Sequence, residues 1–226
     1  MRFTWLGQAG LMMETGGTTV LIDPYLSDAV AAIEPKNHRR VPVDERFFAV
    51  RPTVILLTHD HADHTDPETL AHYLHAHSDV TVLASLHAWR RVRAFGGDNN
   101  YVLFEAGSRF TVGGVCFEAL PAAHSDEHAI GALIGAEGRT CYVTGDTLYS
   151  EQIFAALPRR PIHALFLPIN GVGNNMNTTD AAAFSARVGA TYTVPLHFGL
   201  FDAIDPRAFV CDGCVIPCIY EEIPLP

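Results

Sequence analysis

The sequence has very little lysine: Lys36 is its single lysine, and the other basic residues are all arginine. Its 15 basic residues stand against 25 acidic ones, which gives a formal net charge of −10 at pH 7. Most of such a surface would repel a long polyanion, so we expect no nucleic-acid partner. A small anion held by a few arginines remains compatible with this balance.

The sequence also lacks any apolar run of about 18 residues, the length that a membrane-spanning helix needs. Its first residues, MRFTWLGQAG, show no basic stretch followed by an apolar block, as a secretory signal would. We therefore expect a soluble cytoplasmic protein with no membrane partner, and the sequence is compatible with a homo-oligomer.

Cysteine is scarce, with five residues in the chain. An odd number without a secretion signal argues for free thiols in a reducing compartment. Cys211, Cys214 and Cys218 lie close together, but no fourth zinc ligand follows them. We interpret them as ordinary turn and strand residues rather than as a metal site.

The composition that is present is that of a folded protein, with 48% hydrophobic and 18% charged residues. A chain of 226 residues can bury one substantial core, and it shows no linker, short repeat or low-complexity tract. We therefore predict one domain over residues 1–226.

Short apolar and β-branched runs alternate with turn signals and helical patterns along the chain. Two strand-rich halves, with helices needed on their outer faces, imply two packed sheets covered by helices. Residues 26–48 form a long connection, which we expect to contact substrate. The predicted strands are 2–6, 10–15, 18–23, 53–58, 81–85, 101–106, a hairpin over 109–120, 129–135, 140–146, 164–169, 192–197 and a final strand over 215–223. The predicted helices are 66–77, 87–95, 150–157, 179–189 and 205–210.

A dense histidine cluster, LLTHDHADHTDP, directly follows the strand predicted over 53–58. In an extended segment His59 and His61 point the same way, which suits one divalent ion. Asp63 and His64 then lie at the turn, close enough to serve a second ion. A histidine-rich surface is the alternative interpretation of such a composition, and it fits better the nearby helix that carries His72, His75 and His77.

Three further side chains follow apolar strand-like runs, where a strand passes into a loop: His124, Asp146 and His197. Each alone has an ordinary interpretation as a buried polar residue. Together with the cluster they complete two metal shells.

The ordered set HDHADH, His124, Asp146 in GDT and His197 resembles the metallo-β-lactamase superfamily, and Asp23 in LIDPYL matches that family's first aspartate. The stretches TWLGQAGLMMETGGTTVLIDPYLS, LLTHDHADH, GDTLYS and FLPINGVGNNMN resemble the branch that contains L-ascorbate-6-phosphate lactonase. The resemblance implies an α/β fold, a four-layer αββα sandwich of mixed sheets and outer helices with the site along one edge. Asp146 stands where many true β-lactamases have cysteine, which argues against antibiotic hydrolysis.

The resemblance also implies a ligand set for two divalent ions per chain. Asp23 would orient the ligands by hydrogen bonds. The branch implies manganese, a histidine-rich site also suits zinc, and the residue types do not separate the two. One ion would be bound by His59, His61 and His124, the other by Asp63, His64 and His197, with Asp146 bridging them.

A dinuclear site of this kind holds a hydroxide between its ions at neutral pH, and Asp63 would orient it and pass its proton to the leaving group. We expect a metal-dependent hydrolase that opens a lactone or similar ester of a small, anionic, sugar-phosphate-like molecule. The alternatives are a phosphodiesterase acting on a nucleotide or phospholipid-type substrate, and a metal-holding sensor without turnover.

Substrate contacts are predicted from two segments. Arg39 and Arg40 in the long connection would bind a phosphate, unless they form a solvated basic turn paired with acidic residues. Asn170 would face the pocket, with Asn174, Asn175 and Asn177 as weaker candidates, because Asn is an ordinary loop former. Thr178 or Thr179 would cap the following helix.

Overall fold

The computed structural model describes residues 1–225, in which the first half of the chain builds one mixed sheet. The order of its strands is the order of the sequence, β1-β2-β3-β4-β5-β6. The first three strands pair antiparallel, and β3 to β6 are parallel. The strands are β1 (Arg2–Gly7), β2 (Gly10–Thr15), β3 (Thr18–Ile22), β4 (Val54–Leu57), β5 (Thr81–Ala84) and β6 (Asn100–Leu103).

The second half builds the other sheet, again in sequence order from β7 to β12. Here β7 to β10 pair antiparallel, whereas β10, β11 and β12 are parallel. The strands are β7 (Arg109–Val112), β8 (Val115–Pro121), β9 (Ile130–Ala136), β10 (Arg139–Val143), β11 (Ala164–Pro168) and β12 (Tyr192–Leu196).

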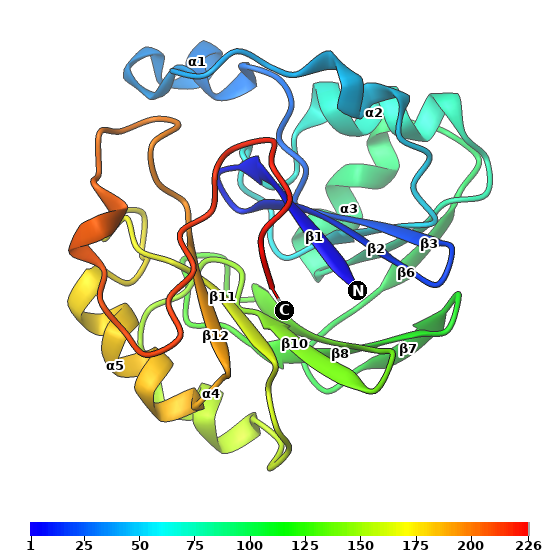
Figure 1. Ribbon diagram of the computed structural model, residues 1–226. Helices are drawn as coiled ribbons and strands as arrows, with labels where there is room; N and C mark the ends of the chain where they lie inside the picture. The colour runs from blue at the N-terminus through cyan, green and yellow to red at the C-terminus, as the bar shows by residue number, and fades with distance from the viewer. Residues whose placement is uncertain (226) are drawn as a thin grey trace.

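Helices cover the outer face of each sheet, which gives four layers (Figure 1). On the first sheet lie α2 (Pro67–Ala76) and α3 (Leu86–Val92), and on the second lie α4 (Glu151–Ala156) and α5 (Thr178–Val188). The predicted αββα sandwich is therefore confirmed. None of the helices within residues 1–225 has the length and apolar character needed to cross a membrane.

Side-chain alternation along β4 shows how the layers are joined. Val54 and Leu56 belong to the cluster between the sheets, whereas Ile55 and Leu57 pack in the cluster under α2 and α3. All four are fully buried, as expected for a strand covered on both faces. Burial of each such side chain contributes about 1.5–3 kcal/mol.

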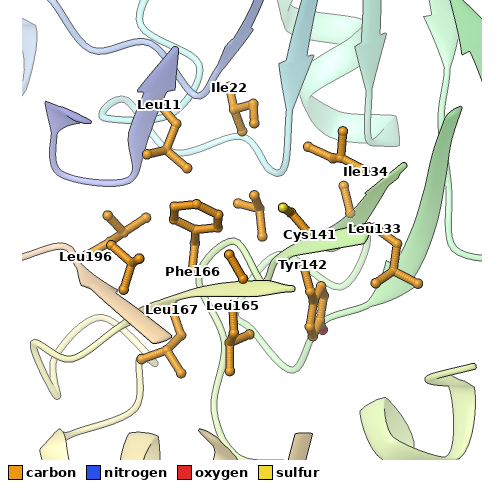
Figure 2. Packing of buried hydrophobic residues seen from close by; sticks show 14 of the residues in the cluster. Leu11, Ile22, Leu133, Ile134, Cys141, Tyr142, Leu165, Phe166, Leu167 and Leu196 are labelled. Carbon is orange, nitrogen blue, oxygen red and sulfur yellow. The ribbon is translucent and has the colours of Figure 1, made fainter. Parts of the chain in front are cut away.

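The core between the sheets is filled by large apolar side chains from both halves (Figure 2). Leu11 and Ile22 of the first sheet face Ile134 and Phe166 of the second. The rings of Phe3 and Phe166 have centroids 4.6 Å apart, which brings the two sheets into direct contact.

N-terminal capping residues were predicted for α2 and α5, and the structure shows the cap of each helix. Asp66 caps α2 by accepting a hydrogen bond from the backbone N–H of Glu68, with Pro67 at the first helical position, as predicted. The predicted cap of α5 was wrong. Asn177, rather than a threonine, accepts the backbone N–H groups of Thr179 and Asp180, because its amide oxygen reaches both.

The predicted final strand over 215–223 was also wrong, because this segment divides its pairing between two sheets. Near Cys214 it pairs with Thr193 of β12, and near Glu222 it pairs with Thr4 of β1. Tyr220, with a φ of +67°, lies where the segment turns from one edge to the other. The helix predicted over 205–210 is a single 3-10 turn, Pro206–Ala208.

The long connection predicted over 26–48 contains short helical pieces that cross one end of the molecule (Figure 1). They are the helix α1 (Ala29–Ile33) and the 3-10 turns Pro35–Asn37 and Glu45–Ala49. Three residues of this connection, Val30, Lys36 and Asn37, line a cavity of about 440 Å³ together with several of the predicted ligands.

Candidate metal centre

The seven predicted ligands converge at one edge of the sandwich, because each follows a strand that ends there. Four of them, His59, His61, Asp63 and His64, follow β4. His124 follows β8, Asp146 follows β10 and His197 follows β12. Both halves of the chain therefore contribute to the same site.

His59, His61 and His124 form the first group, with one donor atom each within 4.8 Å of the others. Nε2 of His124 lies 3.2 Å from Nδ1 of His61. The rings of His59 and His124 are 4.5 Å apart and nearly perpendicular, so their nitrogens point toward one region instead of stacking.

Asp63, His64 and His197 form the second group within the same limit of 4.8 Å. Asp146 lies between the groups. Its Oδ2 is 3.4 Å from Nε2 of His64 and 3.3 Å from Nε2 of His197, and it also groups with His59. This position matches the bridging role that the resemblance implies.

Asp23 is fully buried behind the centre and fixes the orientation of His64. Its carboxylate accepts from the backbone N–H of Thr58 at 2.8 Å and from the Thr58 hydroxyl at 2.6 Å. Oδ2 of Asp23 is also 2.8 Å from Nδ1 of His64. With Nδ1 occupied in this way, Nε2 of His64 is free to bind a metal.

Two amide residues that support the centre were missed by the sequence analysis in this role. Nε2 of Gln8 lies 3.2 Å from both Oδ2 of Asp63 and Nδ1 of His197. Asn175 donates to Oδ2 of Asp146 at 2.7 Å, while its own oxygen accepts the backbone N–H of Thr147. Asn175 was considered only as a substrate contact, and Gln8 lies in a hairpin turn whose sequence gives no sign of this role.

Asn170, predicted to contact substrate, lines the cavity and lies 3.0 Å from Nδ1 of His197. The amide oxygens of Gln8 and Asn170 are buried and have no hydrogen-bond partner among the described residues. Turning the Asn170 amide over would place an oxygen acceptor on Nδ1 of His197, which would direct Nε2 of that ring toward a metal.

Four buried ligand atoms likewise lack a hydrogen-bond partner within residues 1–225: Nε2 of His59, His64 and His197, and Oδ1 of Asp146. Leaving a buried polar atom unsatisfied costs about 1–3 kcal/mol. These residues belong to groups whose donor atoms lie within 4.8 Å of one another, and imidazole nitrogens with carboxylate oxygens are the donors of divalent transition-metal sites. The residues present therefore fit the metal that the fold implies.

Burial and the close approach of charged groups also shift the pKa values of these histidines. Burial lowers the pKa of His59 well below its usual range, and the neighbouring His64 adds to the effect. Burial also acts to lower the pKa of His197, but Asp146 and Asp63 outweigh it and raise this pKa to about 10. Without metal, protons on His197 and His64 balance the carboxylates, and bound cations would take their place.

The structure does not bring Arg39 and Arg40 to the cavity. The Arg39 guanidinium donates to the backbone oxygens of Tyr25 at 2.9 Å and Val41 at 3.2 Å and contacts the hydroxyl of Tyr220. Arg40 is exposed and does not line the cavity. Lys36, three residues earlier in the same connection, is the basic residue that lines it.

Comparison with known proteins identifies the family. Residues 18–198 match the family model described as "Beta-lactamase superfamily domain". Proteins named UPF0173 metal-dependent hydrolase are similar over 93% of this chain and 92% of their own length, at 31% identity in Shouchella clausii and 33% in Geobacillus thermodenitrificans. A solved structure of a possible metal-dependent hydrolase from Veillonella parvula superimposes with a TM-score of 0.82 at 18% identity, covering 100% of this chain and 99% of that one. The chain therefore belongs to the β-lactamase superfamily.

Proposed function

We propose that this chain is a metal-dependent hydrolase that opens a lactone or a similar ester of a small anionic molecule. The observation that carries the proposal is the set of four buried ligand atoms that have no hydrogen-bond partner within residues 1–225, at the site where seven histidine and aspartate side chains converge. The names of the relatives at 31% and 33% identity support hydrolysis that depends on a metal.

Two divalent ions, zinc or manganese, are proposed to bind at this site. When bound, such a pair supplies a water of pKa near neutrality and polarises the carbonyl group of an ester. In the proposed assignment one ion is held by His59, His61 and His124, the second by Asp63, His64 and His197, and both by Asp146.

Asp63 is proposed as the residue that moves the proton. Its Oδ2 faces Gln8 and His197, and its side chain, 16% exposed, also lines the cavity. Oδ1 is then available to accept a proton from the attacking water and to pass it to the leaving alkoxide oxygen. Gln8 limits the rotation of this carboxylate, which favours transfer along one direction.

The cavity supports a small substrate with one anionic group. Its volume of about 440 Å³ suits a molecule the size of a sugar phosphate. Val30, Val172 and Phe201 provide apolar surface, Asn170 an amide, and Lys36 a positive charge. The resemblance to the L-ascorbate-6-phosphate lactonase branch supports the same substrate class. In this proposal Lys36 takes the role first expected of Arg39 and Arg40.

A cytoplasmic location is part of the proposal. All five cysteines are free, as is usual for proteins kept in a reducing compartment.

Ring opening across a lactone panel tests the proposal. Metal-free protein reloaded with Mn²⁺ or Zn²⁺ is assayed by proton release on lactones that include L-ascorbate 6-phosphate. Asp146→Asn should abolish turnover, whereas the matched control Asp79→Asn, an exposed carboxylate paired with Arg51, should retain it. If no lactone opens although metal binds, the ester assignment is wrong, and activity on a phosphodiester panel would then support the alternative reaction.

A further inference from the structure

A second group of metal-capable side chains lies beside the candidate metal centre. His87 is at the start of α3, while Glu127 and His128 belong to the loop between β8 and β9 that also carries His124. One donor atom from each of the three lies within 4.8 Å of the others. The rings of His87 and His128 have centroids 4.8 Å apart at an angle of 80°, so they meet edge to face.

Both imidazoles are held by carboxylates at Nδ1. Nδ1 of His87 lies 2.7 Å from Oδ1 of Asp126, and Nδ1 of His128 lies 2.8 Å from Oε1 of Glu105. A carboxylate accepts a proton from Nδ1 and leaves the Nε2 lone pair of a neutral imidazole available as a ligand. Metal-bound histidines in proteins generally have this outer partner.

The local charge favours a cation. Asp60, Glu105, Asp126 and Glu127 surround the two imidazoles, and Arg91, the nearby basic residue on α3, is paired with Asp60 at 3.0 Å. The excess of carboxylates lowers the electrostatic potential around the two rings, which favours a cation there.

The distance between the donor atoms of Glu127 and His128 can shorten to that found around a bound ion. Donor atoms around tetrahedral zinc lie about 3.3 Å apart, because Zn–N bonds are about 2.0–2.1 Å long. Nε2 of His128 is 3.9 Å from Oε1 of Glu127, whose side chain is 83% exposed and therefore able to adjust. The side chains of His87 and His128 are 37% and 32% exposed, so a water can complete the shell.

We propose that His87, Glu127 and His128 bind a third divalent ion, Zn²⁺ or another transition metal that prefers imidazole. This site does not depend on the proposed hydrolase activity. The ion would link α3, on the first sheet, to the loop that carries His124, on the second. Asp126 extends the connection, because its Oδ2 accepts the backbone N–H of Asp60 between two proposed ligands.

Zinc stoichiometry of the full-length protein tests the site. Metal-stripped protein is dialysed against buffered Zn²⁺ and its bound metal is counted. The wild type should hold about three equivalents, and the double variant His87→Gln with His128→Gln about two. The control His72→Gln, a histidine on α2 whose ring contacts the backbone oxygen of Phe48, should also hold about three.

Two milder variants keep the test decisive if the double variant folds poorly. Glu127→Gln alters an exposed side chain, and Glu105→Gln alters only the partner of His128. Each should weaken the third equivalent by about 10- to 100-fold and leave the other two unchanged. The proposal is wrong if wild type and the folded variants bind the same number of zinc ions with the same affinities.

Discussion

At the scale of single residues, Gln8 is an uncharged residue that supports the candidate metal centre. Its buried amide contacts two proposed ligands, Asp63 and His197. We predict that Gln8→Met, which keeps the size but removes the amide, weakens metal binding by about 10- to 100-fold. Competition with a chelator measures this affinity. Gln152→Met, an exposed glutamine of α4, serves as control, and equal affinities in both variants would contradict the prediction.

Lys36 provides a second prediction, on substrate binding. Lys36→Gln should raise KM for an anionic ester roughly two- to fivefold with little change in kcat, because an exposed charge contributes modestly to binding. The effect should shrink at high salt and be absent for a neutral ester. Arg40→Gln, an exposed arginine of the same connection that does not line the cavity, should leave KM unchanged; if it raises KM and Lys36→Gln does not, the original assignment to Arg40 is right.

His197 provides a prediction for pH. Its pKa in the metal-free fold, about 10, exceeds the ordinary value of 6.5. A raised pKa stabilises the fold fully below the unfolded value, and this stabilisation is lost as the pH rises toward the folded value. The urea midpoint of metal-free protein should therefore fall between about pH 6.5 and pH 10. His197→Gln should decline less, and an equal decline in both proteins would refute the assignment.

The metal-capable residues could be predicted because their type and their place after apolar runs both depend on local sequence. The residues that contact these ligands by hydrogen bonds could not be predicted in the same way. Gln8 reaches Asp63 across 55 positions, and nothing in a hairpin turn signals such a contact. Arg39 and Lys36 are three residues apart, and only the backbone path through the turn Pro35–Asn37 decides which of them lines the cavity.

At the scale of elements, the connection over 26–48 is anchored by Arg39, which joins Tyr25 to Tyr220. We predict that Arg39→Gln lowers the free energy of unfolding by about 1–2 kcal/mol, because several hydrogen bonds of a charged group are lost. Urea unfolding of the metal-loaded protein measures it. Arg46→Gln, in the same connection but at an exposed side chain that pairs with Asp44 two residues away, should change stability by less than about 0.5 kcal/mol.

Elements with strong local signals were predicted well, and those that depend on distant partners were not. The buried strand β4 and the capped helix α2 are specified by apolar runs and by Asp66-Pro67. The segment over 215–223 has strand-like composition, but its pairing partners lie near Thr4 and Thr193, at opposite ends of the chain. Composition alone cannot show that a segment is shared between two sheets.

At the scale of the whole molecule, each half of the sequence builds its own sheet, and the candidate metal centre requires both halves. The sandwich could be predicted because this strand order keeps neighbours in sequence next to one another in space. Bound ions would therefore couple the two sheets, and removing them should lower the melting temperature of the entire fold.

The segment after Gly213 has a further consequence, for the association of one molecule with another. It lies against β1 and β12, the outermost strands on the same side of their sheets, and occupies part of their backbone hydrogen-bonding capacity. If a protease removes this segment, the edge strands β1 and β12 both lose these backbone hydrogen-bond partners. Open edge strands pair with strands from other chains, so the shortened product would be prone to aggregate. Loss of Ile223 from the core between the sheets would add to this tendency.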